Sequence, residues 1–374
     1  MNRIAIATHT ALVGGKEYDG IGNSVKETLS GLTDEFVFVR HSMDGLLSSE
    51  VQLYKNKDKL VVESSELKVV RAFGPLRYIS EVRETVKYFT NNPVDVYVGV
   101  DPLNALAGVI LKQKGVIKKA IFYTPDYSPK RFSSKILNKI YHKIDEYCVK
   151  NSDEVWSVSP KIVEIRRKMG LSENVNILIP NVPPTKYDVF KKNDHNKYSI
   201  ITYGIIDNQM DFEGLIKAVS LLKKDIPEIK LIIAGNGPEE ANLKKLTKSL
   251  GITKNVHFMG KLKFSDTLEL ASKSGVGAAL YNGRWGFNEF GDSTKVREYT
   301  NFGLPVLSTD KHATVLDIEK FNAGVIVDVD TNSYVAGLQE IFNNYDKYSA
   351  NSRKMGEAYA GVHSKLFKKL LRQK

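Results

Sequence analysis

The chain has 374 residues, of which 42% are hydrophobic and 10% aromatic, so it can bury a large core and is not a disordered protein. Its 54 Lys and Arg against 43 Asp and Glu give a net charge of +11, which favours anionic partners such as nucleotides, nucleic acid, phospholipid headgroups or lipid-linked phosphates. The single cysteine, Cys148, excludes an intrachain disulfide and a Cys-rich metal site, and it fits buried helix packing in a reducing compartment.

Short β-branched runs alternate with helix-length amphipathic segments along the whole chain. This alternation is typical of parallel α/β sheets with crossover helices. No apolar run approaches the roughly 20 residues that a membrane-spanning helix needs. We therefore expect a cytoplasmic protein, soluble or peripheral at the inner face of the membrane. The predicted strands of the first half are residues 3–8, 35–42, 94–100, 118–125, 153–159 and 175–180.

A polar tract with two prolines, residues 181–196, interrupts both periodicities and predicts a linker or domain boundary. A second α/β series follows it. Its predicted strands are residues 198–204, 230–238, 255–260, 275–282, 304–309 and 323–329. The predicted organisation is an N-terminal Rossmann-like domain (1–185), a C-terminal Rossmann-like domain (186–345) and a helical tail (346–374) that packs back on the N-terminal domain. Two doubly wound domains that face a central cleft would place the active site in that cleft.

The first glycine cluster, "VGGKEYDGIGNSV", follows the first predicted strand. Gly14 and Gly15 permit close backbone approach, so the loop either presents N–H groups to a phosphate or sugar, or is a plain flexible connection. The dinucleotide fingerprint G-x-G-x-x-G is absent here. Ser24 and Glu27 predict a capping box at the start of the next helix.

The segment "YTPDYSPKRFSSKILNKIYHK" places Asp126 at the end of a predicted parallel strand. A carboxylate there faces the cleft, where it could act as a general base for an acceptor hydroxyl; the alternative is a turn-forming aspartate after proline. In the following helix, Lys135, Lys139 and Lys143 form a basic face. That face suits an anionic membrane surface, or is simply solvated.

Asp328 and Asp330 match the D-x-D metal motif by letters alone. They follow the predicted strand "AGVIV", where a turn explains them better than a shared cation does. We therefore predict no metal site.

The segment "STKVREYTNFGLPV" predicts a helix with two cations, Lys295 and Arg297, near its N-terminus, where the helix dipole disfavours positive charge. A diphosphate at this end would receive backbone N–H groups, the Ser293 and Thr294 hydroxyls and the Lys295 ammonium. Glu298 could then accept hydrogen bonds from ribose hydroxyls. The alternative is an i,i+3 surface pair between Lys295 and Glu298.

These second-half motifs, "IITYG", "LIIAGNGPEEANLKKL", "NVHFMGKL", "GVGAALYN", "STKVREYTNFGLPVLST" and "AGVIVDVD", resemble the donor domain of glycosyltransferase family 4. The first half is similar to its acceptor domain through "GGKEYDGIGNSV", "SDEVWSVSP" and "ILIPNV". The resemblance implies the GT-B fold and a UDP- or GDP-sugar as donor. It also implies a nucleotide site with Glu298 on the ribose, Lys295 on the diphosphate and Gly260, Lys261 and Leu262 beside the base. Gly204 belongs to this predicted site, and Gly14 and Gly15 match the loop across the cleft.

The chain departs from the family pattern at three places. The first acid of the E-x7-E motif falls on Phe290, so Glu289 or Asp292 would have to substitute for it. The usual basic pair is missing from "YGIIDNQMDFEG". Lys295 would therefore have to balance most of the phosphate charge, with Arg297 or Arg284 as helpers. Asp126 stands where the acceptor domain usually has a histidine. An aspartate there suits base-assisted direct displacement, and the stereochemical outcome stays open.

The predicted function is metal-independent transfer of a sugar from a nucleoside diphosphate sugar to a hydroxyl acceptor, in cell-surface glycan, polysaccharide or glycolipid biosynthesis. The candidate catalytic residues are Asp126, Glu289 and Asp292. The predicted partners are the donor, a glycan or lipid-linked acceptor and an anionic membrane surface, with no required cofactor. The alternatives are a GT-B-fold sugar-nucleotide epimerase, and a non-catalytic basic protein that binds nucleic acid or membrane lipid. The chain shows no recognisable nucleic-acid module, so we expect no nucleic-acid partner.

Overall fold

The computed structural model describes residues 2–13, 16–18, 21–55, 61–70, 74–183, 196–284 and 288–372. The chain forms two compact units, which we call unit 1 (Met1–Pro180 with Gly361–Lys374) and unit 2 (Asn181–Ala360). The sequence analysis placed the domain boundaries after residues 185 and 345. In the structure the chain enters unit 2 at Asn181 and leaves it at Gly361, so half of the predicted tail belongs to unit 2.

Unit 1 contains a nine-stranded sheet in the order β5-β4-β3-β1-β6-β7-β8-β9, with β2 paired to β1. The part of the sheet that runs in the order β3-β1-β6-β7-β8-β9 is parallel. Each predicted strand of the first half is confirmed. The sequence analysis missed β2, β4 and β5, which pair antiparallel. The strands are β1 (Ile4–Val13), β2 (Lys16–Tyr18), β3 (Glu35–Ser42), β4 (Glu50–Lys55), β5 (Val61–Glu66), β6 (Val96–Val100), β7 (Lys119–Thr124), β8 (Glu154–Ser157) and β9 (Asn176–Leu178).

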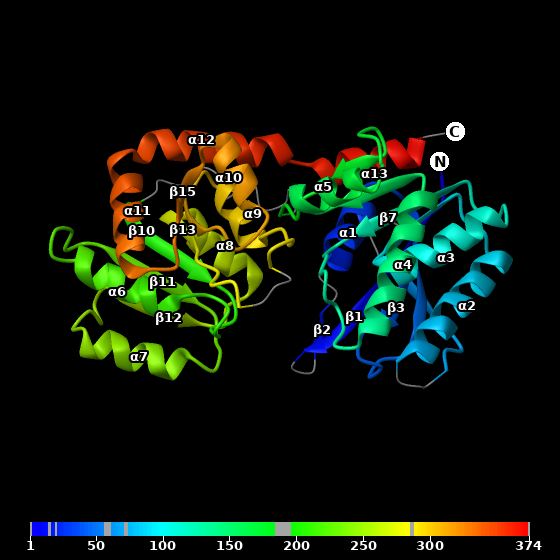
Figure 1. Cartoon of the computed structure of the whole chain (residues 1–374), viewed down its shortest axis with the longest axis horizontal. Coiled ribbons are helices and arrows are strands. Elements are labelled where there is room, and N and C mark those ends of the chain that lie inside the picture. Colours follow the sequence, from blue (N-terminus) through cyan, green and yellow to red (C-terminus); the bar gives the residue numbers. More distant parts are fainter. Residues whose placement is uncertain are drawn as a thin grey trace. The chain divides into compact units, whose positions relative to one another are not determined.

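The helices of unit 1 cover both faces of this sheet (Figure 1). Helices α2, α3 and α4 pack in a row, and α3 lies on β6 and β7, while α1 packs against α13. The predicted capping box is wrong, because α1 begins at Ile21 and Ser24 therefore lies inside the helix. The helices are α1 (Ile21–Ser30), α2 (Pro75–Asn91), α3 (Pro102–Gln113), α4 (Lys135–Asn151), α5 (Pro160–Lys168) and α13 (Val362–Arg372).

Unit 2 contains a fully parallel six-stranded sheet in the order β12-β11-β10-β13-β14-β15. The order reverses between β10 and β13, and open α/β sheets bind ligands outside the carboxyl ends of the strands at such a switch point. All six predicted strands of the second half are confirmed. They are β10 (Asn196–Tyr203), β11 (Lys230–Ala234), β12 (Val256–Gly260), β13 (Ser274–Ala279), β14 (Val306–Thr309) and β15 (Gly324–Val327).

Helices also cover both faces of the unit 2 sheet. On one face α6 contacts β11, α7 and α11, and on the other α8, α9 and α10 contact β10, β13, β14 and β15 (Figure 1). Side chains such as Ile200, Leu231 and Val276 are fully buried between these layers. The helices are α6 (Phe212–Leu222), α7 (Glu240–Ser249), α8 (Phe264–Ser272), α9 (Thr294–Asn301), α10 (Val315–Phe321), α11 (Thr331–Asn343) and α12 (Tyr345–Tyr359).

The C-terminal helices divide between the two units. Helix α12 packs against α9 and α10 of unit 2. Helix α13 packs on unit 1, where the Phe367 ring lies 5.4 Å from the Trp156 ring, and His363 is hydrogen-bonded to the Tyr123 hydroxyl at 3.1 Å. None of the helices in the described ranges is both long and apolar enough to cross a membrane.

Candidate active site

Three glycines end neighbouring strands at the carboxyl edge of the unit 2 sheet. The N–H of Gly204, after β10, donates to the Ala234 carbonyl at 2.9 Å, and the N–H of Gly235, after β11, donates to the Gly260 carbonyl at 2.8 Å. Both Gly204 (φ +131°) and Gly235 (φ +142°) have backbone angles that other residues rarely adopt. A side chain at Gly235 would strike the Gly204 carbonyl oxygen, so glycine keeps this edge open and its backbone accessible.

Lys295, in the first turn of α9, lies directly over this edge. A Cβ atom added to Gly204 would stand 3.1 Å from Lys295 Cε and 3.3 Å from its Nζ. The ammonium also lies 5.4 Å from the centre of the Tyr281 ring and 3.4 Å from the Tyr281 hydroxyl. The predicted phosphate ligand is thus held at the switch point between β10 and β13, and Tyr281, which the sequence analysis missed, helps to position it.

The N-terminus of α9 has free hydrogen-bond donors beside Lys295. Ser293 is the N-cap, and its Oγ accepts a hydrogen bond from the Val296 N–H at 3.4 Å. The same Oγ lies 3.1 Å from the Tyr281 hydroxyl. Within the described part of the chain, the backbone N–H groups of Thr294 and Lys295 have no acceptor. Two N–H donors, a hydroxyl at Thr294 and one ammonium form a typical environment for an anion.

Glu298, one turn further along α9, is buried and accepts a hydrogen bond from the Tyr203 hydroxyl at the end of β10. Burial raises the pKa of Glu298 to about 7, although the Tyr203 bond and the Lys295 charge oppose the shift. Glu298 is buried and forms no ion pair with Lys295. The alternative of an i,i+3 surface pair is therefore wrong. Tyr203 was also missed; its only sequence signal is its place just before the glycine that ends the strand.

Arg297 is buried and ion-paired within unit 2. Its guanidinium is buried and donates to Asp292 Oδ1 at 2.8 Å and to Asp317 Oδ2 at 2.6 Å. These contacts disfavour its predicted role as a helper cation, because two carboxylates already balance its charge. Asp292 Oδ1 also accepts from the Thr314 hydroxyl at 2.9 Å, and its Oδ2 from the Asn181 N–H at 2.7 Å. Asp292 remains a candidate catalytic acid only as a prediction, and its geometry favours a structural role.

The other predicted residues of unit 2 have less definite roles. Glu289 and Arg284 are exposed on the chain between β13 and α9. Gly260 ends β12 with φ +67°, Lys261 is exposed, and Leu262 packs partly against the core. Their assignment to catalysis or to the base therefore stays a prediction. Gly14 and Gly15 lie outside the described residues.

Asp126 follows the end of β7 in unit 1. Its Oδ1 accepts a hydrogen bond from Arg131 Nη1 at 2.6 Å, and 39% of the side chain is exposed. Burial would lower the pKa of Arg131, but the charges of Tyr141 and then of Asp126 outweigh it, so the pKa is raised. The carboxylate is accessible but already paired on one oxygen, so its role as a base is still a prediction.

The sequence analysis missed a buried charged cluster at the carboxyl edge of the unit 1 sheet. His9 of β1 lies with its Nδ1 2.6 Å from Asp101 Oδ2 and its Nε2 3.1 Å from Glu81 Oε2. Burial alone would lower the pKa of His9, but the two carboxylates outweigh it and raise the pKa to about 10. The neighbouring His41 shows the opposite shift: burial, and then the His9 charge, lower its pKa to about 3.

The described residues contain no group of three His, Cys, Asp or Glu side chains placed to hold a metal ion. Asp330 caps α11, and its Oδ2 accepts from the Ser333 N–H at 2.9 Å. This confirms the turn interpretation of the D-x-D letters.

One protein-family model matches most of unit 2. Residues 185–358 match the family described as glycosyl transferases group 1. An uncharacterized glycosyltransferase of Haemophilus influenzae is 28% identical over 191 residues, which are 50% of this chain and 50% of that protein. The match thus spans about half the length of this curated relative.

Solved structures share the fold of the whole chain. HepE from Anabaena in complex with UDP is 12% identical, covers 99% of both chains and has a TM-score of 0.66; its complex with UDP-glucose has a TM-score of 0.62. The lipopolysaccharide outer core galactosyltransferase WaaB is 15% identical, also covers 99% of both chains and has a TM-score of 0.62. Residues 185–358 of this chain therefore match the glycosyl transferases group 1 family model, and its two α/β units have the GT-B fold.

Proposed function

We propose that this chain is a glycosyltransferase that moves a sugar from a nucleoside diphosphate sugar, with UDP as the preferred nucleotide, to a hydroxyl acceptor. The observation that carries the proposal is the arrangement of Lys295, Glu298 and Tyr203 around Gly204 at the switch point of unit 2. The family match of this unit and the UDP complexes of HepE support it.

The proposed chemistry assigns a different part of the nucleotide to each group. The two N–H groups of α9 and the Lys295 ammonium face the diphosphate, where negative charge grows as the bond to the sugar breaks. Preorganised donors at that position lower the barrier. Glu298 accepts from the ribose hydroxyls, with Tyr203 fixing the orientation of the carboxylate. No metal is needed in this scheme, because Lys295 and the helix N-terminus supply the positive potential.

We assign acceptor binding to unit 1 and keep Asp126 as the proposed base and Glu289 as the proposed acid near the donor sugar. For Asp292, the other predicted acid, the contacts with Arg297, Thr314 and Asn181 favour a structural role. We also propose a glycan or lipid-linked acceptor, as in the biosynthesis of cell-surface glycans. The acceptor proposal rests on the positive charge of the chain and on the similarity to WaaB.

The first test is a thermal-shift screen of nucleoside diphosphates and their sugars. A ligand at 100 times its dissociation constant stabilises a protein by about 2.7 kcal/mol. We expect UDP to raise the melting temperature, and Lys295→Ala to lose most of the shift. Lys245→Ala, which removes an exposed lysine of α7, is the matched control. Equal shifts in all three proteins would overturn the site.

The second test measures turnover. A UDP-sugar and candidate glycan acceptors should yield free UDP and a new glycoside, and excess EDTA should leave the rate unchanged. An isomerised UDP-sugar without a glycoside would instead identify an epimerase. A rate that disappears with EDTA and returns with a divalent cation would contradict the metal-independent scheme.

A further inference from the structure

Helix α4 exposes apolar side chains along its outer face. Ile136 is 73% exposed, Ile140 51% and Tyr147 41%, although side chains of this kind are usually buried in a protein of this size. The opposite side of the helix carries Asp145, Cys148 and Val149, which are buried. The apolar outer face is therefore not needed to hold α4 on the sheet.

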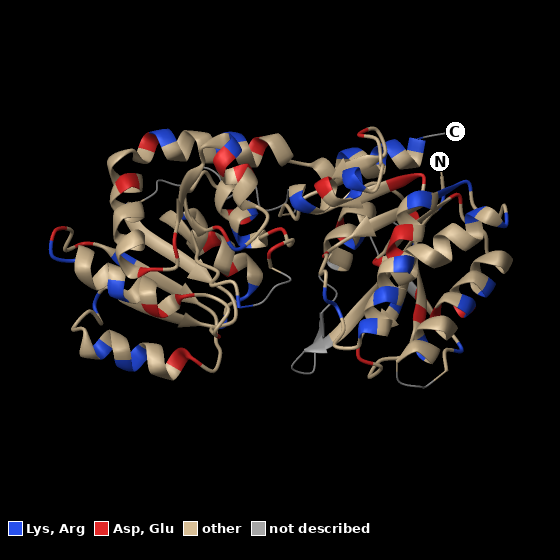
Figure 2. Cartoon of the chain, in the orientation of Figure 1, with Lys and Arg blue, Asp and Glu red and all other residues tan. Residues whose placement is uncertain are grey.

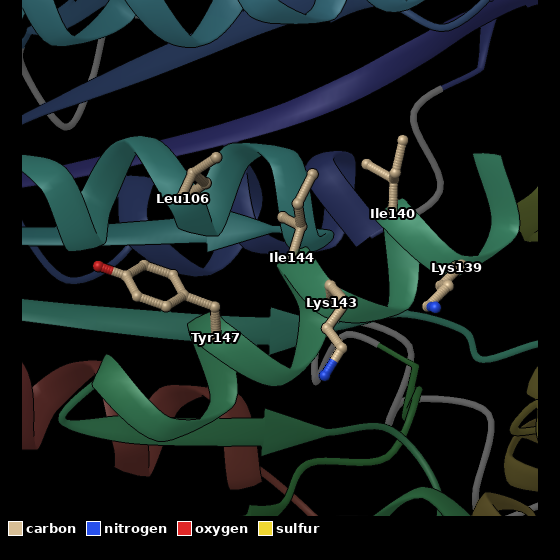
Figure 3. Close-up of a pocket in the computed structure, with 6 residues that line it drawn as sticks. All are labelled: Leu106, Lys139, Ile140, Lys143, Ile144 and Tyr147. Carbon is tan, nitrogen blue, oxygen red and sulfur yellow. The ribbon is translucent and has the colours of Figure 1, made fainter. Parts of the chain in front are cut away.

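A shallow groove of about 350 Å³ continues this apolar face between α4 and α3. Figure 3 shows Ile140 and Ile144 extending from one side of α4, and Lys139 and Lys143 from the other. Tyr147 closes one end of the groove, where its hydroxyl accepts a hydrogen bond from Gln113 of α3 at 2.8 Å. The residues that line the groove are Leu106, Lys139, Ile140, Lys143, Ile144 and Tyr147.

A row of lysines runs beside the apolar residues. Lys135, Lys139 and Lys143 follow one another at i,i+4 spacing and are all exposed, and basic positions recur along α4 in Figure 2. Glu146 lies on the same side and bonds Lys143 and Lys150. In the described part of the chain Lys135 and Lys139 have no ion-pair partner, so their charges are available to an anionic surface.

We propose that this face of α4, defined by Ile136, Ile140 and Tyr147 with Lys135, Lys139 and Lys143, docks on an anionic phospholipid bilayer. A helix with an apolar stripe beside a basic one lies in the membrane interface: the apolar side chains enter the headgroup region and the lysines contact lipid phosphates. A nucleic acid would use the lysines but leave the isoleucines in water. A second copy of the chain would bring two rows of lysines together, and these would repel each other.

The experiment is co-sedimentation of the full chain with vesicles of phosphatidylcholine, with and without phosphatidylglycerol, at low and physiological salt. We expect binding only to the anionic vesicles, and weaker binding at the higher salt. Lys139→Glu/Lys143→Glu should lower the affinity at least tenfold, since each lysine near an anionic surface contributes about 1 kcal/mol. Lys245→Glu/Lys248→Glu makes the same change in net charge on exposed positions of α7 and should keep most of the binding.

A second pair of variants tests the apolar half. Ile136→Ser/Ile140→Ser should weaken binding even at low salt, whereas Leu221→Ser/Leu316→Ser, at positions 44% and 42% exposed in unit 2, should leave it unchanged. The UDP thermal shift of each variant reports folding and donor binding without any lipid. The docking proposal can therefore fail while the proposed function stands, and the proposed function can fail while the docking proposal stands.

Three results would overturn the proposal. The first is a wild-type protein that stays in the supernatant with anionic vesicles at low salt. The second is an equal loss of binding in the α4 and α7 glutamate variants, which would mean that only net charge matters. The third is a change from dimer to monomer in Ile136→Ser/Ile140→Ser with vesicle binding intact, which would identify the face as a contact between copies.

Discussion

Tyr203, the last residue of β10, donates its hydroxyl hydrogen bond to the buried carboxylate of Glu298 on α9. The bond links the strand and the helix that border the switch point of the unit 2 sheet. It also fixes which oxygen of Glu298 is free to face a ligand. Burial raises the pKa of this carboxyl group to about 7. A ligand whose hydroxyls donate hydrogen bonds to it would stabilise its charged form.

Glu298→Gln should weaken UDP binding. A hydrogen bond to a charged group contributes about 1.5 to 3 kcal/mol, which corresponds to a rise of roughly tenfold to a hundredfold in the dissociation constant. Isothermal titration calorimetry measures this dissociation constant for UDP. Tyr203→Phe removes only the orienting bond and should cause a smaller loss. Unchanged UDP affinity in Glu298→Gln would exclude the ribose role.

The affinity for UDP should depend on pH through Glu298. Below pH 7 this side chain is largely protonated in the free protein, so ribose hydroxyls lack a charged acceptor. The affinity should therefore rise with pH, by up to about tenfold per unit, and level off above 7. The control is Glu298→Gln: the titration of UDP itself affects both proteins alike and cancels in their ratio. A flat ratio between pH 5 and 8 would contradict the prediction.

The raised pKa of Glu298 also has a consequence for stability. Its ordinary value is 4.5, so between pH 4.5 and about 7 the folded protein binds more protons at this site than the unfolded chain does. The contribution of Glu298 to stability therefore falls as the pH rises through this range. Chemical denaturation of the ligand-free protein should show that the free energy of unfolding falls less over this pH range in Glu298→Gln than in the wild type.

Gly204→Ala should impair UDP binding as well as stability. The new methyl group would stand 3.1 Å from Lys295 Cε, so the lysine has to move, and the positive φ adds strain of about 1 to 2 kcal/mol. Gly115→Ala is the control: it also has a positive φ, but a Cβ there meets nothing within 4 Å. Both variants should melt earlier, and only Gly204→Ala should bind UDP more weakly.

Asp292→Asn separates a structural from a catalytic role. Breaking a buried ion pair costs about 3 to 5 kcal/mol, and Asp292 holds Arg297, Thr314 and the Asn181 N–H. We expect a large fall in melting temperature, measured by calorimetry, with kcat per folded molecule nearly unchanged. Asp317→Asn, which removes the second partner of Arg297, should behave in the same way. A stable Asp292→Asn with a collapsed kcat would instead assign it to catalysis.

The His9 cluster predicts a stability that falls at alkaline pH. The pKa of His9 is raised from 6.5 to about 10 in the folded protein, so its contribution is complete below pH 6.5 and disappears as the pH rises through 10. The difference in melting temperature between wild type and His9→Asn should therefore shrink from pH 6 to pH 10. His142→Asn, which loses a hydrogen bond to the Pro129 carbonyl and ring contacts with Tyr127 and Tyr141, should show no such trend. A constant difference for His9→Asn would mean that the imidazole is neutral throughout.

Strand and helix patterns in the sequence predicted the parallel core of both sheets, since each buried strand is a short β-branched run bounded by turn residues. Gly303 was also predictable as the end of α9: it follows the C-cap with φ +77°, a conformation that glycine adopts without strain. The strands β4 and β5 were missed, because half-buried strands such as β4, "EVQLYK", carry charged and polar residues that weaken the alternation.

The sequence by itself predicted the fold class and the family features of unit 2, and it singled out Lys295 and Glu298 as candidate ligands, because these inferences depend on local spacing and on one helix N-terminus. Only the tertiary structure decided which of the two nearby cations is available to a ligand. Lys295 lies over the open glycine edge, while Arg297 is buried between Asp292 and Asp317. Tyr203, His9 and Glu81 likewise gain their partners from segments distant in the chain, and the charge state of a buried group depends on such partners and on its distance from water.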